Sequence, residues 1–172
     1  FTGLLAPFFW NNLAEYQKQR ILTFLNPDLD PMGSAYHIIQ SVTAIGSGGF
    51  FGKGFGQGSQ TQLKFLPVQE SDFILSVIAE EFGFMGVSVV MIIFFLFIKT
   101  LLDIAFKLSD YFSSLVIVGI TSILLSHIFI NSAMTIGLLP VKGLPLPFIS
   151  AGGSFLLSCF IMLSLVINLS DN

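Results

Sequence analysis

Three long apolar runs limit most strongly what this chain can fold into. They cover residues 73–98, 111–136 and 155–169, the last as the core of a longer apolar stretch. A helix needs about 20 apolar residues to cross a hydrocarbon core of about 30 Å. Because lipid offers no hydrogen bonds to the backbone, each run is predicted to be a transmembrane helix.

Composition supports this assignment. The 172 residues are 53% hydrophobic and only 10% charged, whereas soluble domains carry about 25% charged residues. Seven scattered basic residues and a net charge of -3 argue against a nucleic-acid partner. We therefore predict an all-α polytopic membrane protein forming one membrane domain over residues 1–172. The apolar start, Phe1 to Trp10, is too short to span and is expected to end an earlier helix of a larger bundle.

Residues 11–71 are predicted to form a long loop with short helices on the membrane surface. Glu15 to Leu25 and Tyr36 to Ile45 have helical periodicity. Seven glycines then fall between Gly46 and Gly58, so this backbone must bend sharply or approach another segment closely. The stretch matches no phosphate-binding motif, and a flexible, membrane-adjacent loop is favoured over an anion-binding nest around Lys53.

A second irregular stretch, between Gly137 and Ser154, contains three prolines and four glycines. Irregular backbone at membrane depth is tolerated where it is buried in protein or lines a wet cavity, so a re-entrant loop is predicted. Ser150 and Ser154 lack a His and Asp arrangement, which argues against a serine nucleophile. Basic residues alone do not settle the orientation, because the long loop is at the length limit of the positive-inside rule.

Acidic residues at the start of the first run are the strongest candidates for chemistry. Asp72 stands where the polar loop enters the apolar helix, and Glu80 and Glu81 follow within it. Acids inside a membrane segment are costly and indicate function by default. For Asp72, position alone favours a helix N-cap over a catalytic role. For Glu80 and Glu81 the alternative is a buried structural acid, protonated or paired.

Two helical stripes allow a structural and a functional interpretation. Ala79, Gly83 and Gly86 lie below Asp72 on one face, which favours close helix packing over a groove for a lipid tail. On the second run, His127, Asn131 and Thr135 share a face at intervals of four residues. Hydrogen bonding between helices explains them better than catalysis. The two histidines and the single Cys159 match no zinc spacing.

Several segments, taken together, resemble the SEDS family of RodA, FtsW and SpoVE proteins, with the RodA branch closest. They are YQKQRILTFLNP (16–27), YHIIQS (36–41), AIGSGG (44–49), GKGFGQGSQTQLKFLP (52–67), SDFILSVIAEEFGFMG (71–86) and GLLPVKGLPLPFISAGGS (137–154). Val68 and Glu70 depart from the family pattern PExHTD, and Ala151 stands where a Tyr is usual. The resemblance implies the C-terminal part of a bundle of about ten helices.

The resemblance also implies a function. It indicates a peptidoglycan glycosyltransferase for cell shape or division, which polymerises lipid II at the outer face of the bacterial cytoplasmic membrane beside a class B penicillin-binding protein. The long loop is then extracytoplasmic. The family's catalytic aspartate falls on Asp72, which would accept a proton from the attacking sugar hydroxyl as general base. Candidate substrate-binding residues are Lys53, Lys64, Lys142, Glu80 and Ser150.

Three alternatives stay open at this level. A divalent cation, Mg²⁺ or Mn²⁺, could help the lysines neutralise the departing diphosphate, although no metal ligands are assigned. A transporter that flips the same lipid could use Glu80 and the small-residue stripe as its path. A membrane scaffold without catalytic activity would need none of these groups.

Overall fold

The architecture is a set of helices of very different lengths. The structure, a computed structural model, describes residues 14–15, 17–18, 21–22, 34–58 and 72–170. Three helices are long and apolar enough to cross a membrane, and the described ranges contain no strand. The prediction of an all-α architecture is therefore confirmed for these residues, and each of the three predicted spans corresponds to a helix that is long and apolar enough to cross a membrane. The elements are α3 (Ser34–Gly48), α5 (Ile74–Lys107), α6 (Tyr111–Thr135) and α7 (Gly153–Ser170).

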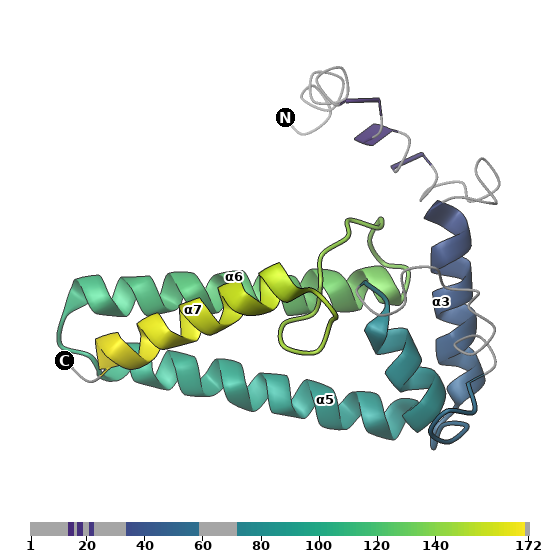
Figure 1. Ribbon diagram of the computed structural model, residues 1–172, viewed down its shortest axis with the longest axis horizontal. Coiled ribbons are helices and arrows are strands. Elements are labelled where there is room, and N and C mark those ends of the chain that lie inside the picture. The colour runs from purple at the N-terminus through teal and green to yellow at the C-terminus, as the bar shows by residue number, and fades with distance from the viewer. Residues whose placement is uncertain (1–13, 16, 19–20, 23–33, 59–71, 171–172) are drawn as a thin grey trace, which may run out of the picture.

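The long helices lie side by side, and the shorter elements gather at one end of them (Figure 1). α6 returns antiparallel to α5, and α7 runs back along both. α3 and the first part of α5 cross the end of this bundle, where the connection between α6 and α7 also lies. Residues 34–58, Asp72 and residues 136–152 are thus at the same end, and the C-terminus is at the other.

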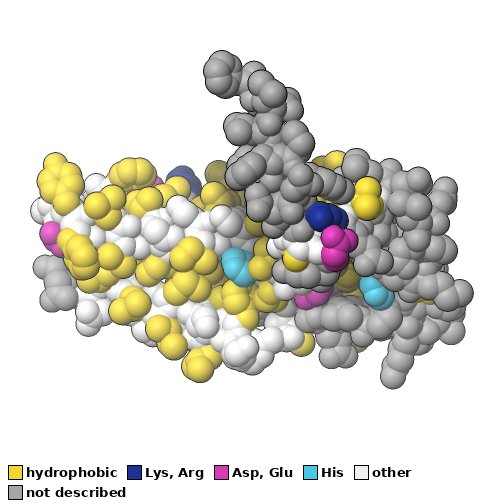
Figure 2. All heavy atoms as spheres, turned by 90° about the horizontal axis from the view of Figure 1, so that it is seen from above, with side chains coloured by type: hydrophobic (Ala, Val, Ile, Leu, Met, Phe, Trp, Pro, Cys, Tyr) yellow, Lys and Arg dark blue, Asp and Glu magenta, His cyan; other side chains and the backbone are white. Residues whose placement is uncertain are grey.

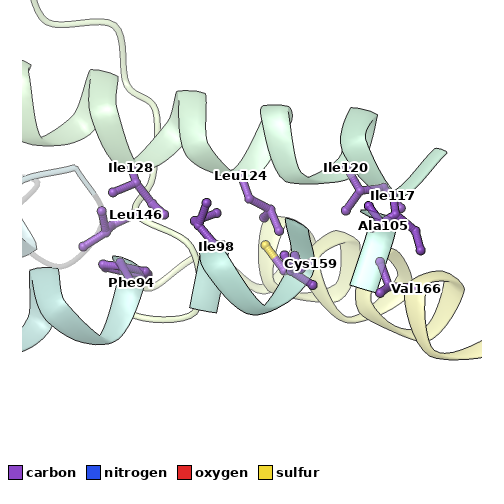
Figure 3. Close-up of a cluster of buried hydrophobic side chains, with 11 residues drawn as sticks. Phe94, Ile98, Ala105, Ile117, Ile120, Leu124, Ile128, Leu146, Cys159 and Val166 are labelled. Atoms are coloured by element: carbon purple, nitrogen blue, oxygen red, sulfur yellow. The ribbon is translucent and has the colours of Figure 1, made fainter. Parts of the chain in front are cut away.

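The core is a line of apolar contacts between the long helices (Figure 3). On α5 the buried positions recur every three or four residues, which is the spacing of one helix face. α6 supplies a matching face, while the fully buried side chains from α7 are Cys159 and Val166. Leu146, from the connection before α7, also reaches this core. The cluster consists of Phe94, Ile98, Leu101, Ala105, Ile117, Ile120, Leu124, Ile128, Leu146, Cys159 and Val166.

α5 is longer than the sequence predicted. The predicted span ended at Ile98, before Lys99, whereas the helix continues to Lys107. The buried face continues past the first charge, because Leu101 and Ala105 still pack against α6. The charged side chains of Lys99 and Asp103 are exposed on the opposite side. These charges end the apolar run without ending the helix.

The turn between α5 and α6 is short and is closed by a helix cap. Asp110 is the N-cap of α6, and its carboxylate accepts hydrogen bonds from Ser113 N at 2.9 Å and Ser113 Oγ at 2.6 Å. These bonds lower the pKa of Asp110 below its ordinary value. Ser114 Oγ donates to Ala105 O at 2.8 Å, which ties the start of α6 to the end of α5.

Much of the apolar surface of the long helices is not covered within the chain. In the apolar windows of α5, α6 and α7, only 22%, 33% and 11% of the residues are buried. Figure 2 shows the hydrophobic side chains spread over one face of these helices. Exposed apolar surface on this scale requires lipid or further helices around it.

A break in α5 divides the helix into two arms. Gly83 has φ 68° and ψ -164°, a backbone conformation that is essentially restricted to glycine. The arm after the break, residues 84–107, is the one that lies along α6. The arm before it, residues 74–82, turns away beside α3 and carries Asp72 at its start (Figure 1). The break therefore determines where Asp72 lies.

The backbone of the glycine-rich loop after α3 forms hydrogen bonds with α5 on both sides of this break. In a continuous helix, Phe84 N and Met85 N would donate to Glu80 O and Glu81 O. Here they donate to Gly49 O and Phe50 O, at 3.0 and 3.2 Å. The two freed carbonyls, Glu80 O and Glu81 O, instead accept hydrogen bonds from Lys53 N at 3.0 Å and Gly54 N at 2.9 Å. The loop thus satisfies the backbone groups that the break exposes.

The glycines of this loop are explained by close approach. A Cβ atom on Gly48 would lie 1.9 Å from Ala79 O, and one on Gly52 would lie 2.1 Å from Glu81 O. The predicted close approach is confirmed, but the favoured flexible loop is wrong, because the backbone is bonded on both sides of the break. Gly46 and Gly48 also belong to α3, which is longer than the predicted Tyr36 to Ile45 helix.

The first predicted surface helix, Glu15 to Leu25, is described only in part. Its five described residues are all helical: Glu15, Gln17, Lys18, Ile21 and Leu22. Its placement on a membrane surface stays a prediction.

Candidate functional site

Asp72 lies immediately before α5 and is half-buried. The N-cap residue of α5 is Phe73, and no side chain caps the helix. The capping role that position favoured for Asp72 is therefore wrong. The neighbouring Phe73 is buried, with 2% of its surface exposed, and it anchors this end of the arm. The Asp72 carboxylate is left available for another purpose.

The connection between α6 and α7 forms one side of the Asp72 environment. A Cβ atom placed on Gly143 would lie 3.4 Å from Asp72 Oδ2, so the carboxylate rests directly against this glycine. Gly143 also has φ 66°, which suits glycine better than any other residue. Lys142, the preceding residue, is exposed, so the connection carries a cationic side chain on the residue next to Gly143.

The polar stripe of α6 holds these segments together. Asn131 Nδ2 donates to Asp72 O at 2.9 Å and to Leu144 O at 2.7 Å. His127 Nδ1 lies 3.3 Å from Pro145 O, and Thr135 O accepts a hydrogen bond from Ser41 Oγ of α3 at 2.7 Å. The predicted hydrogen bonding between helices is found only at the Thr135 carbonyl, because the His127 and Asn131 side chains face segments outside the helices and the Thr135 hydroxyl donates to Asn131 O within α6 at 2.7 Å. The link of this stripe to Asp72 could not be read from the sequence.

A buried ion pair occupies the break in α5. Lys53 Nζ lies 2.9 Å from Glu80 Oε1, and Ser47 Oγ donates to the same oxygen at 3.4 Å. Glu80 is fully buried, whereas Lys53 keeps 29% of its side chain exposed. The structural alternative for Glu80, a paired buried acid, is thus what the contacts show. Glu81 also binds the glycine-rich loop, because its Oε1 accepts a hydrogen bond from Gly56 N at 3.1 Å.

Replacing Lys53 by Met should destabilise the protein by about 3 kcal/mol, because a buried carboxylate loses its lysine. The loss falls at the low end of the range for broken buried pairs, since Glu80 can take up a proton. The measurement is the thermal unfolding midpoint in detergent, with the exposed Lys99→Met as the matched control. The double variant Lys53→Met, Glu80→Leu should recover most of the loss. An unchanged midpoint for Lys53→Met would show that the pair does not contribute to stability.

The remaining predicted site residues are spread over the chain. Ser150 is buried, and its Oγ accepts a hydrogen bond from Leu146 N at 2.8 Å, so it shapes the turn before α7. Its predicted contact with substrate stays a prediction, as do those of Lys53, Lys142 and Glu80. Lys64 lies outside the described residues.

The stripe of small residues on α5 is used for packing. Ala79 and Gly83 are buried, and α3 and the glycine-rich loop lie against them. The packing partner is therefore within this chain, and the space proposed for a lipid tail is filled along this part of the helix. A separate apolar hollow of about 210 Å³ has no polar lining and lies further along α5. It is lined by Val90, Ile93, Phe94, Phe97, Phe148 and Ile149.

Within residues 34–58 and 72–170, no three His, Cys, Asp or Glu side chains lie close enough to hold a metal ion. What the described residues place together at this site is the half-buried Asp72 carboxylate, Gly143 and a loop that carries Lys142. Such a carboxylate can accept a proton from a bound hydroxyl group.

Comparison with known proteins decides the family. The family model described as cell cycle protein, FTSW_RODA_SPOVE, matches residues 2–172. The chain belongs to the FtsW/RodA/SpoVE family. Its resemblance to this family, inferred above from short motifs, is thereby confirmed over nearly the whole sequence.

Curated members of the FtsW/RodA/SpoVE family are similar over most of the chain. The peptidoglycan glycosyltransferase MrdB of Escherichia coli K12 is 43% identical over 157 residues, covering 91% of this chain and 42% of MrdB. The peptidoglycan glycosyltransferase RodA of Treponema pallidum is 40% identical over 158 residues, covering 92% of this chain and 36% of that RodA. Stage V sporulation protein E of Bacillus subtilis is 40% identical over 170 residues, covering 99% and 44%. The chain thus spans about two fifths of the length of these relatives.

The fold is also found in a solved structure. A chain from a peptidoglycan synthase complex, studied for the coordination of polymerization and crosslinking, superposes with a TM-score of 0.78. It is 29% identical, and the match covers 99% of this chain and 46% of that chain. The overall arrangement of the helices therefore also occurs in that chain.

Proposed function

We propose that this sequence forms the catalytic end of a peptidoglycan glycosyltransferase that polymerises lipid II. The observation that carries the proposal is the Asp72 carboxylate, which is half-buried, does not cap α5 and rests against Gly143. The names of the relatives as peptidoglycan glycosyltransferases support the reaction class. The substrate would be a disaccharide linked through a diphosphate to an undecaprenyl chain.

The proposed chemistry is transfer of a glycosyl group. A sugar hydroxyl attacks the anomeric carbon, a new C–O bond forms, and the bond from that carbon to the diphosphate breaks. Asp72 accepts the hydroxyl proton, which contributes typically 10² to 10⁴-fold to such reactions. The diphosphate leaves with its negative charge, which Lys142 and Lys64 are proposed to neutralise, with Mg²⁺ or Mn²⁺ as an additional cation.

The proposed setting is the bacterial cytoplasmic membrane. Residues 34–58, Asp72 and residues 136–152 share one end of the bundle (Figure 1), which we assign to the extracytoplasmic side, where the sugar would be polymerised. Leu146 packs in the core between the long helices, which supports a re-entrant path for its loop. A class B penicillin-binding protein is proposed as partner, supported by the similar chain in a synthase complex.

The test is polymer formation by purified protein of the relatives' full length carrying this sequence. In detergent, with lipid II as the only substrate, long glycan strands should appear on a gel, with or without a penicillin-binding protein present. A lipid transporter needs two compartments and would give no polymer in detergent. Absence of polymer, with the protein folded and its partner bound, would exclude the proposed activity. Addition of a chelator tests the divalent cation separately.

A further inference from the structure

The side chain of Asn131 joins the two segments that enclose the Asp72 carboxylate. It is fully buried on α6, and its amide nitrogen donates to Asp72 O and to Leu144 O, 59 and 13 residues away. We infer that Asn131 is a positioning residue for the proposed general base, acting through the main chain of Asp72. The inference rests on the proposed function and adds a residue to it.

The position of the Asp72 backbone depends on the bond to Asn131, because the hydrogen bonds of helix α5 do not include the Asp72 carbonyl. The first turn uses the carbonyl of Phe73, which accepts from Ser76 N at 3.0 Å and Val77 N at 3.4 Å. Phe73 itself is not helical, with φ -114° and ψ 24°. The carbonyl of Asp72 therefore points out of the helix and is bound by Asn131. This bond fixes the backbone from which the carboxylate projects.

The same amide group of Asn131 also positions the loop that lies against the Asp72 carboxylate. Leu144 follows Gly143, the residue against which Asp72 Oδ2 rests. Because both partners of Asn131 are carbonyl oxygens, only the NH₂ end of the amide can face them. One side chain thus fixes both the base and the loop beside it. A shift of about 1 Å in such a reacting group can lower a rate by about 10²-fold.

Packing does not explain an asparagine at this position. Asn131 Oδ1 is buried and has no hydrogen-bond partner. A buried acceptor without a partner is unfavourable, and an apolar residue of similar shape would avoid it. The two hydrogen bonds that Asn131 donates both reach segments around Asp72. They are the favourable contribution that offsets the unsatisfied oxygen.

The test compares Asn131→Leu with Thr121→Val in the full-length protein, together with its penicillin-binding protein. Thr121 is a matched control, since it is buried on the same helix and its hydroxyl donates only to Ile117 O of its own helix. Asn131→Leu should lower kcat for glycan polymerisation by about 10 to 100-fold and leave KM for lipid II within about twofold. Thr121→Val should leave both unchanged. If Asn131→Leu lowers the thermal midpoint, Asn131→Ser, which is too short to reach either carbonyl, replaces it.

A double variant separates positioning from general damage. Added to Asp72→Asn, Asn131→Leu should cause no further loss of the residual rate, because Asn131 acts through Asp72. The same loss in both backgrounds, or a kcat equal to that of Thr121→Val, would overturn the inference and leave the proposed function intact. Full activity of Asp72→Asn alone would instead overturn the assignment of the base.

Discussion

Replacing Asp72 by Asn is expected to lower glycan polymerisation by about 10² to 10⁴-fold without unfolding the protein. The amide has the shape of the carboxyl group but cannot accept the proton of the attacking hydroxyl. The structural contacts of this residue are made by its backbone, whose carbonyl accepts from Asn131. The side chain caps no helix, so its replacement removes no stabilising hydrogen bond from α5.

The measurement is the rate of strand formation from lipid II by full-length protein, with folding followed by the thermal midpoint and by binding of the penicillin-binding protein. Asp103→Asn is the matched control, because Asp103 is an exposed acid near the far end of α5, the helix that follows Asp72. It should retain full activity. A normal rate for Asp72→Asn would refute the assignment of this carboxylate as the general base.

The spans could be predicted because the bilayer sets their length. A run of apolar residues has few alternatives to a helix in lipid, and α6 begins at the predicted Tyr111 and ends one residue early, at Thr135. The end of α5 could not be predicted in the same way. Its charged residues mark a change of surroundings, whereas the helix continues to Lys107 because Leu101 and Ala105 still pack in the core.

The sequence predicted individual residues of the site but not the contacts between them. Asp72 was identified from its place at the entrance of a helix and from the family resemblance, but its neighbours were not. Asn131 and Gly143 meet it through contacts that connect residues 59 and 71 positions apart, and no local pattern encodes these. The pairing of Lys53 with Glu80 depends on a loop that inserts into a helix break. An asparagine within an apolar span was the one available signal for the positioning residue.

Replacing Gly83 by Ala is expected to destabilise the protein by about 5 kcal/mol, beyond the usual range for a single substitution. Gly83 has φ 68° and ψ -164°, which a residue with a Cβ atom adopts only under strain. The new Cβ would also lie 2.3 Å from Gly52 N and 2.6 Å from Phe50 O. Both contacts are backbone atoms of the glycine-rich loop. Moving either atom would break the hydrogen bonds between this loop and the rest of the chain.

Gly119→Ala provides the matched control for this prediction. Gly119 lies within α6, and a Cβ atom there would meet nothing within 4 Å. This substitution should be neutral or stabilise by about 0.5 to 1 kcal/mol, because alanine favours helix interiors over glycine. Thermal midpoints in detergent compare the two variants, and equal midpoints would show that the break at Gly83 tolerates a side chain. A stable Gly83→Ala protein with normal polymerisation would go further. It would show that the arm carrying Asp72 does not need the break to reach Asn131.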